Sequence, residues 1–371
     1  MLFKKSFIII SSITLFFITS CISDLVIYGS GDVNLKRVSF SDLNNWDDDD
    51  HAPALISFLN SCNKFASMPD SRMIGGQIGN IFVRDFRDVC EIGKVIKGMG
   101  SSQARNFFEN WFAPFIVSSK DGNYYGKFTG YYVPTLRGSR VQTETYKYPV
   151  YIKPKNIDNN PYYTRSEIES GALRNQDLEL LYVDDKIDLF FTHIQGSGNV
   201  MIDDGVIVRL SYAGSNNQPF SSIGKYMIKN DVISGDKSYF AIKKWLKENP
   251  DKADAILNIN LSYIFFKENN NNNVVGGAGV SLMTERSIAI DKDILPYGYP
   301  FWVDIKGYKS GGYQKLLISQ DTGSAIKGTI RADIFFGSGE ESEIRAANMN
   351  NEGRYYILLP INLVDKFSGI K

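Results

Sequence analysis

The chain has 371 residues, which is more than a single hydrophobic core usually contains, so two domains are expected. Lys plus Arg and Asp plus Glu both total 41, so the formal net charge of zero excludes a strongly charged surface built to attract nucleic acid and favours an uncharged or mixed-charge partner. Aromatic residues make up 13% of the chain, and the short apolar runs rich in Val, Ile, Phe and Tyr predict a mainly β protein with a few helices.

The N-terminus has the pattern of a bacterial lipoprotein signal. Lys4 and Lys5 precede about fifteen mostly apolar residues, a run too short to span a bilayer comfortably but suited to a signal peptide. The run ends at Cys21, so we expect residues 1–20 to be removed, Cys21 to carry a lipid, and residues 21–45 to form a tether. An ordinary secretory signal with an incidental cysteine is the alternative. Both signals direct the mature chain out of the cytoplasm.

Two further cysteines and an acidic run mark the first helical region. Cys62 and Cys90 would close a loop of 27 intervening residues and stabilise it by about 3 kcal/mol if bonded, with buried free thiols as the alternative. Pro53 suits the first turn of a helix over "APALISFLNSCNKF", and the preceding acids Asp47 to Asp50 suit its dipole. A metal site with His51 is the alternative for these acids, but a solvated helix start is the simpler interpretation.

The next segments predict helices, then strands. "SSQARNFFENWFAPF" fits a second helix, with Ser101 or Ser102 as its N-cap and Pro114 as its terminator. Residues 126–234 read as short strands joined by glycine-rich turns.

The second half repeats this order. "SYFAIKKWLKENPDKADAILNIN" predicts two helices broken at Asn249-Pro250, and strands dominate after the polar loop 269–273. The succession of helices, strands, helices and strands is consistent with one β domain inserted into another.

Carboxylates are the best candidates for catalysis. The two histidines, His51 and His193, exclude a multi-histidine metal site and leave little material for a Ser-His-Asp triad. "GGAGVS" at 276–281 lacks the lysine and the helix of a phosphate loop. Ser197 lies in Gly-Ser-Gly before a hairpin, not in a strand-to-helix elbow, so we interpret it as a turn residue. No metal or cofactor is predicted.

The stretch "QDTGSAIKGTIRADIFFG" contains two candidate acids. Asp321 lies in Asp-Thr-Gly-Ser, but an aspartic protease needs two such loops, and a homodimer would have to supply the second. Asp333 lies in a predicted strand, where alternation puts it on one face with Arg331 and Phe335. Apolar neighbours would raise the pKa of Asp333 and suit it to general-acid catalysis. A surface ion pair between Asp333 and Arg331 is the alternative.

Several motifs resemble one known family when they are taken in their shared order. They are "FFENWFAPF", "GKFTGYYVPTLRGSR", "YPVYIKP", "TRSEIESGAL", "DLFFTHIQGSGNV", "YAGSNNQPFSSIGKYMI", "NLSYIFFKE", "TERSIAIDKDILPYG" and "QDTGSAIKGTIRADIFFGSG". Together they resemble the membrane-bound lytic murein transglycosylase A family, which carries a C-terminal three-aspartate (3D) domain. The chain departs from the family where relatives often have Asp-Pro and a Leu-Gly turn, since it has Asp291-Lys292 and Tyr297-Gly298.

The resemblance implies a double-psi β-barrel domain with an inserted second β-barrel domain and a groove between them. The barrel with its N-terminal helices would comprise residues 46–130 and 255–371, and the insert residues 131–254. The three aspartates map by motif onto Asp291, Asp321 and Asp333. Asp333 inherits the role of general acid and then base, with Asp321 and Asp291 as supporting neighbours.

The implied activity is cleavage of the β-1,4 bond between N-acetylmuramic acid and N-acetylglucosamine in peptidoglycan, with formation of a 1,6-anhydro product. The expected groove contacts are Thr129, Tyr131, Tyr132, Gln195, Ser197 and Thr284, although the first three could equally be structural. A hydrolytic muramidase, an aspartic-type protease and a non-catalytic murein-binding lipoprotein are the competing functions.

The same resemblance implies a monomer on the periplasmic face of the outer membrane, anchored by lipid at Cys21 and acting on glycan strands. Ile22 favours the outer membrane, because an acidic residue after the lipidated cysteine commonly marks retention in the inner membrane.

Overall fold

The computed structural model describes residues 26–29, 31–157, 160–202, 205–269, 273–309 and 311–368. The expected signal peptide and Cys21 lie outside these ranges, and the polar loop 269–273 lies partly outside them. Within the described part of the chain, no helix combines the length and the apolar character needed to cross a bilayer.

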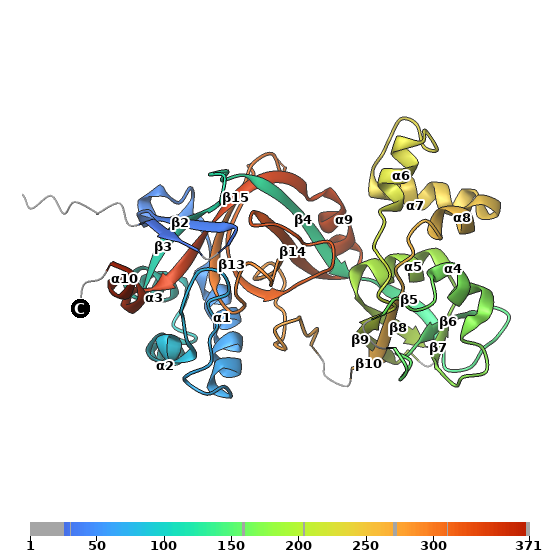
Figure 1. Ribbon diagram of the computed structural model, residues 1–371, viewed down its shortest axis with the longest axis horizontal. Coiled ribbons are helices and arrows are strands. Elements are labelled where there is room, and N and C mark those ends of the chain that lie inside the picture. Colours follow the sequence, from blue (N-terminus) through green and yellow to red (C-terminus); the bar gives the residue numbers. More distant parts are fainter. Residues whose placement is uncertain are drawn as a thin grey trace, which may run out of the picture.

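A closed six-stranded barrel forms the larger part of the molecule (Figure 1). Its strands pair in the order β15–β12–β13–β11–β14–β4, and β4 pairs with β15 to complete the ring. Two pairings, β11 with β13 and β14 with β4, are parallel, and the others are antiparallel. The sheet continues beyond β15 through β3, β2 and β1. The strands are β1 (Val26–Tyr28), β2 (Val33–Arg37), β3 (Phe112–Ser119), β4 (Gly126–Val133), β11 (Ser287–Ile290), β12 (Pro300–Ile305), β13 (Tyr313–Asp321), β14 (Arg331–Ser338) and β15 (Asn350–Pro360).

This ring is the double-psi β-barrel that the family resemblance implies, and the mainly β fold is confirmed. Its interior is apolar: every residue of β11 and β12 is buried, and Trp302 is among the largest fully buried side chains. Residues from both halves of the sequence therefore share one core.

Helices from both ends of the described chain cover the barrel. Cys62 in α1 and Cys90 in α2 form a disulfide bond that joins these two helices. Asp50 caps α1 by accepting a hydrogen bond from the Ala52 amide, as expected for an acidic helix start. The helical segments are η1 (Phe40–Asp42), η2 (Trp46–Asp48), α1 (His51–Ala66), η3 (Val83–Phe86), α2 (Arg87–Ile96), α3 (Ser101–Trp111), α9 (Glu340–Asn348) and α10 (Ile361–Ser368).

A second sheet of six strands lies beside the barrel, in the order β10–β9–β8–β5–β7–β6 (Figure 1). Its strands are β5 (Thr135–Ser139), β6 (Tyr148–Tyr151), β7 (Glu179–Val183), β8 (Ser197–Ile202), β9 (Ile207–Ser215) and β10 (Ile264–Glu268). The helices α4 (Arg165–Glu167), η4 (Ile168–Ala172), α5 (Lys186–Gln195), α6 (Ile223–Lys229), α7 (Tyr239–Glu248) and α8 (Pro250–Leu257) accompany it. Because β10 pairs in this sheet, the chain returns to the barrel later than the expected boundary at residue 254.

Three local expectations from the sequence differ from the structure. Gly100, not a serine, is the N-cap of α3, and the Ser101 hydroxyl instead accepts a hydrogen bond from the His51 amide. The helix ends at Trp111, so Pro114 does not terminate it but lies within β3. The segment 186–195, expected to contain strands, is the helix α5, and the Asp185 side chain stabilises its start by accepting hydrogen bonds from two of its amides.

Asp49 is not part of a solvated helix start. It is 9% exposed and accepts hydrogen bonds from both terminal nitrogens of Arg286, at 2.7 and 2.8 Å. It also accepts the Leu316 amide at 2.9 Å. The start of α1 is therefore fixed to the barrel by a buried ion pair with satisfied hydrogen bonds.

Candidate active site

Four residues form a row across neighbouring strands of the barrel. Ala289 of β11 pairs with Asp321 of β13 on one side and with Asp333 of β14 on the other. Asp333 in turn pairs with Thr129 of β4. Residues paired in register project to the same face, so two strand spacings separate the aspartates by roughly 10 Å between Cα atoms. Because Ala289 carries only a methyl group, the space between the two carboxyl groups stays open.

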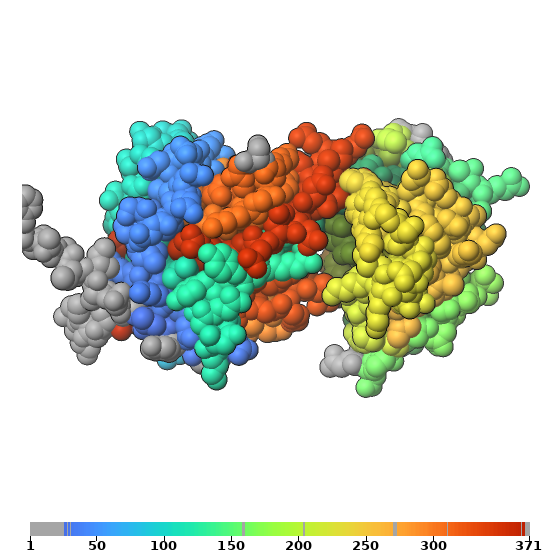
Figure 2. Space-filling view, turned by 90° about the horizontal axis from the view of Figure 1, so that it is seen from above, coloured from blue at the N-terminus to red at the C-terminus, as the bar shows by residue number. Residues whose placement is uncertain are grey.

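This row forms one wall of a cavity of about 300 Å³ between the barrel and the inserted domain. Figure 2 shows the molecule hollowed between the C-terminal strands, coloured red, and the insert, coloured yellow and green. The barrel contributes Thr129, Gly130, Tyr131, Ala289, Asp321, residues 322–326, Arg331 and Asp333, and the insert contributes Arg165, His193, Ile194, Gln195, Phe220, Asn260, Ser262 and Ile264.

Among the described residues, Asp333 has one hydrogen-bond donor, and that donor is itself hydrogen-bonded to a cation. The Thr129 hydroxyl donates to Asp333 Oδ1 at 2.6 Å, and Arg331 Nη2 donates to the same hydroxyl at 2.8 Å. Burial raises the pKa of Asp333 above its ordinary value. The charge of Arg331, the Thr129 hydrogen bond and the charge of Lys127 oppose that rise without cancelling it. A larger fraction of this carboxyl group is therefore protonated than of a free aspartate.

Asp321 has three donors. Tyr131 donates its hydroxyl proton to Oδ2 at 2.7 Å, and the amides of Gly277 and Thr322 donate to Oδ1 at 2.8 and 2.9 Å. Burial raises the pKa of Asp321, the three hydrogen bonds oppose that rise, and the nearby charge of Asp333 adds to it. The anion of Asp321 is thus better provided with donors than the anion of Asp333.

Asp291 does not line the cavity. It is 4% exposed, and its carboxyl group accepts hydrogen bonds from the amides of Gly328 and Asp293 at 2.9 and 3.2 Å and from Lys327 Nζ at 3.2 Å. It therefore holds the loop that joins Asp321 to Asp333. Asp291 therefore supports the other two aspartates by holding the backbone between them, not by lining the cavity with them.

The six expected groove contacts fall into two groups. Thr129, Tyr131 and Gln195 line the cavity, whereas Tyr132, Ser197 and Thr284 do not.

The second group occupies other places in the fold. Tyr132 is buried, donates its amide to Gln195 Oε1 at 3.0 Å, and places its hydroxyl 3.2 Å from that of Tyr239. Ser197 is the first residue of β8 and follows Gly196, the C-cap of the helix α5. Thr284 is exposed and lies against Gly337, where an added Cβ would be 2.6 Å from its hydroxyl oxygen. Tyr132 thus connects the barrel to the insert beside the cavity.

Arg165 and His193 line the cavity but were not among the expected site residues. Arg165 is 1% exposed, donates to the carbonyl groups of Asn260 and Ser262, and has Nη1 3.1 Å from His193 Nδ1. Burial and the charge of Arg165 lower the pKa of His193 well below its ordinary value, so its imidazole is neutral near pH 7. The rarity of histidine was the only feature of the sequence that could have drawn attention to His193. Arg165 had no such signal, because its hydrogen-bond partners come from distant segments.

Comparisons with known proteins agree with this geometry. The family model of the MltA specific insert domain matches residues 127–267, and that of the 3D domain matches residues 286–359. The crystal structure of a membrane-bound lytic murein transglycosylase from Agrobacterium tumefaciens is 30% identical, with a TM-score of 0.80, over 90% of this chain and 99% of that one. MltA from Neisseria gonorrhoeae is 30% identical, with a TM-score of 0.76, over 91% and 95% of the two chains.

The chain belongs to the membrane-bound lytic murein transglycosylase A (MltA) family. The MltA relative from Vibrio cholerae is 39% identical over 241 residues, which are 62% of this chain and 64% of that protein. The MltA of Escherichia coli K12 is 33% identical over 62% of this chain and 65% of its own length. The chain thus matches slightly less than two thirds of the length of these two relatives. The region that matches the 3D domain of MltA contains Asp291, Asp321 and Asp333, and the region that matches the MltA insert supplies the opposite wall of the cavity.

Proposed function

We propose that this protein is a lytic transglycosylase that cleaves the β-1,4 bond between N-acetylmuramic acid and N-acetylglucosamine in peptidoglycan. The observation that carries the proposal is the row Asp321–Ala289–Asp333–Thr129, which has two half-buried carboxyl groups on one wall of an interdomain cavity. An E. coli MltA structure, 26% identical with a TM-score of 0.68, has bound chitohexaose, which supports a glycan as the ligand of this cavity.

Asp333 is the proposed acid because the described residues provide it with a single donor, whereas they provide Asp321 with three. Protonated Asp333 gives its proton to the glycosidic oxygen as the bond from that oxygen to C1 breaks. The C6 hydroxyl oxygen of the same muramic acid then attacks C1, and its proton returns to Asp333. No water is consumed, so the product ends in 1,6-anhydromuramic acid and the carboxyl group is restored for the next cycle.

The surrounding residues support this sequence of steps. Arg331 acts on Asp333 through the Thr129 hydroxyl and stabilises the carboxylate that exists between the two proton transfers. The three donors to Asp321 stabilise its anionic form, which would favour the positive charge that develops at C1 during bond cleavage. Gln195 lines the cavity from the insert and offers its side-chain amide to the sugar.

Product analysis tests the proposal directly. Mass spectrometry of muropeptides released by the wild type is expected to show anhydro products, each one water lighter than the product of a hydrolytic muramidase. Asp333→Asn is expected to abolish release while chitohexaose binding is retained, and Asp251→Asn, an exposed change on α8, serves as the matched control. Product from Asp333→Asn at the wild-type rate would reject Asp333 as the acid, and release of hydrated products would identify a muramidase.

We also propose that the mature chain acts as a monomer anchored by lipid at Cys21 to the periplasmic face of the outer membrane. The names of the relatives describe them as membrane-bound, which supports an envelope location. Cys21→Ala is expected to move the protein from the membrane fraction to the soluble periplasmic fraction, and continued membrane association of that variant would reject the anchor.

A further inference from the structure

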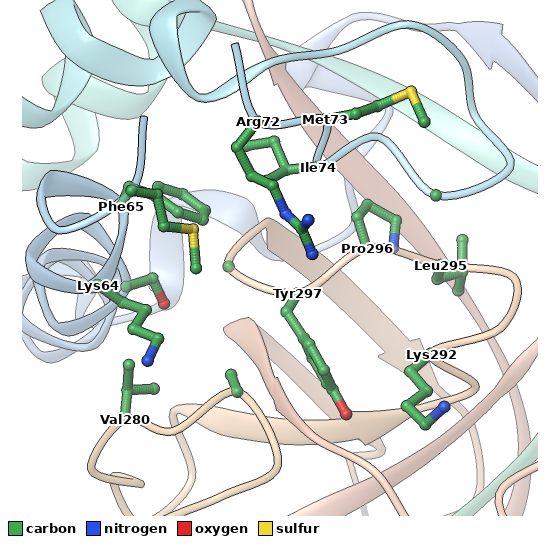
Figure 3. A pocket seen from close by; sticks show the side chains of 15 residues that line it. Lys64, Phe65, Arg72, Met73, Ile74, Val280, Lys292, Leu295, Pro296 and Tyr297 are labelled. Atoms are coloured by element: carbon green, nitrogen blue, oxygen red, sulfur yellow. The ribbon is translucent and has the colours of Figure 1, made fainter. Parts of the chain in front are cut away.

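A second cavity of about 300 Å³ lies outside the interdomain cleft (Figure 3). It is bounded by the C-terminal half of α1 and by three loops, at residues 72–76, 278–280 and 292–298. Its floor is apolar and includes Phe65, Met68, Leu295, Pro296 and the ring of Tyr297. A volume of this size is at the lower end of the range for ligand sites.

The charged groups of this cavity are all cationic. Lys64, Arg72 and Lys292 line it, and none of its fifteen described lining residues is acidic. Lys292 is paired with Asp293 at 2.9 Å, but neither Lys64 nor Arg72 has an ion pair with any described residue. Figure 3 shows Arg72 reaching toward Tyr297 and Lys64 reaching toward Val280. Two unpaired cations above an apolar floor suit a carboxylate carried on a short aliphatic segment.

The glycine-rich segment 276–279 separates this cavity from the catalytic row. On one side, the Gly277 amide donates to Asp321 Oδ1. On the other side, Ala278 lines the cavity, and the Lys64 ammonium lies 3.4 Å from where a Cβ of Gly279 would be. An added Cβ at Gly277 would be 2.8 Å from the Tyr297 hydroxyl and 3.5 Å from Asp321 Oδ1. The two cavities therefore share a thin backbone wall that also positions Asp321.

We propose that this cavity, which we call the α1 pocket, binds a free carboxylate of a murein peptide stem. The inference rests on the proposed function, because the stems are the acidic part of that substrate. Stem peptides combine carboxylates with short aliphatic side chains, which matches Lys64 and Arg72 above the apolar floor. The shared wall favours this occupant over a lipid headgroup, since it brings the pocket next to the residues that act on the glycan to which the stem is attached.

Binding of the isolated stem tests the site without requiring turnover. Calorimetry of the full chain in detergent would use the tripeptide L-Ala-γ-D-Glu-meso-diaminopimelate and the same peptide with its carboxylates amidated. The double variant Lys64→Gln/Arg72→Gln is expected to weaken binding of the acidic tripeptide by about tenfold or more. The amidated peptide is expected to bind no better to the wild type than to this variant. Lys97→Gln/Lys120→Gln removes the same charge from exposed positions outside both cavities.

A turnover comparison separates this inference from the proposed function. The pocket variant is expected to lose activity on stem-bearing glycan while activity on glycan stripped of stems is unchanged. Equal loss on both substrates, or equal tripeptide binding by variant and wild type, would overturn the pocket assignment even if anhydro products form. Charge-dependent binding of phosphatidylglycerol vesicles without tripeptide binding would also overturn it in favour of a lipid. Tripeptide binding that depends on Lys64 and Arg72, without any anhydro product, would uphold the site and reject the proposed activity.

Discussion

Replacing Thr129 with valine removes both hydrogen bonds of its hydroxyl group while keeping the shape of the side chain. The lost hydroxyl donates to Asp333 Oδ1 at 2.6 Å and accepts from Arg331 at 2.8 Å. That donation stabilises the carboxylate and lowers the pKa of Asp333 against the larger effect of burial. Its removal is therefore expected to raise the pKa of Asp333 further.

The size of the expected change in the pKa of Asp333 follows from the free energy of the Thr129–Asp333 hydrogen bond. A hydrogen bond of this kind contributes about 1.4 kcal/mol, which corresponds to about one pH unit. The proposed general acid must be protonated, so activity falls as the pH rises through the pKa of Asp333. The alkaline limb of the profile is thus expected to move upward by about one unit in Thr129→Val.

The assay is the pH dependence of kcat/KM for release of anhydro product, which reports ionisation of the free enzyme. Thr135→Val, an exposed change at the start of β5, is the matched control. An unmoved alkaline limb would show that Thr129 does not act on the proton of Asp333. A downward shift would mean that Arg331, freed from the hydroxyl, pairs directly with the carboxylate, and it would refute the relay through Thr129.

Two further changes test the row. Burial raises the pKa of Asp333 above the unfolded value of about 3.9, so its favourable contribution is complete below that value and is lost as the pH rises through the folded pKa. Asp333→Asn is therefore expected to melt at a higher temperature than the wild type near pH 7 but not near pH 3, and equal melting near pH 7 would contradict this. Ala289→Leu is expected to fill the gap between the aspartates and abolish chitohexaose binding in a folded barrel; Ala289→Gly is the control, and binding by the leucine variant would contradict the gap.

Part of the site could be predicted from local pattern. Alternation in "IRADIFFG" places Arg331 and Asp333 on one face, and both line the cavity. The alternation does not determine the importance of Ala289, which arises only because β11 pairs with β13 in parallel and with β14 antiparallel. Such pairings join distant segments, so a single sequence carries no local signal for them.

The same limit applies to the buried charges. The acidic run Asp47 to Asp50 indicates a helix start, and Asp50 is indeed the cap of α1. Asp49, however, pairs with Arg286, which lies 237 residues away in the sequence. Asp291 likewise has the motif of its family but contacts the loop at Gly328 and not the cavity. Sequence motifs identify these residues as candidates. Only the tertiary structure shows which of them line the cavity and which hold other parts of the fold.

The closure of the barrel has a consequence for when the chain becomes active. Thr129 pairs with Asp333 in β14 and with Asn350 in β15, so the strand that carries Thr129 has a partner on both sides only when the last strand of the ring is in place. Contacts between such distant segments form slowly and late in folding. A partly synthesised chain would contain Thr129 without its acid, and a nicked chain that lost β15 would lose the closure of the ring. The complete row, and with it the proposed activity, is therefore a property of the whole folded chain and not of any fragment of it.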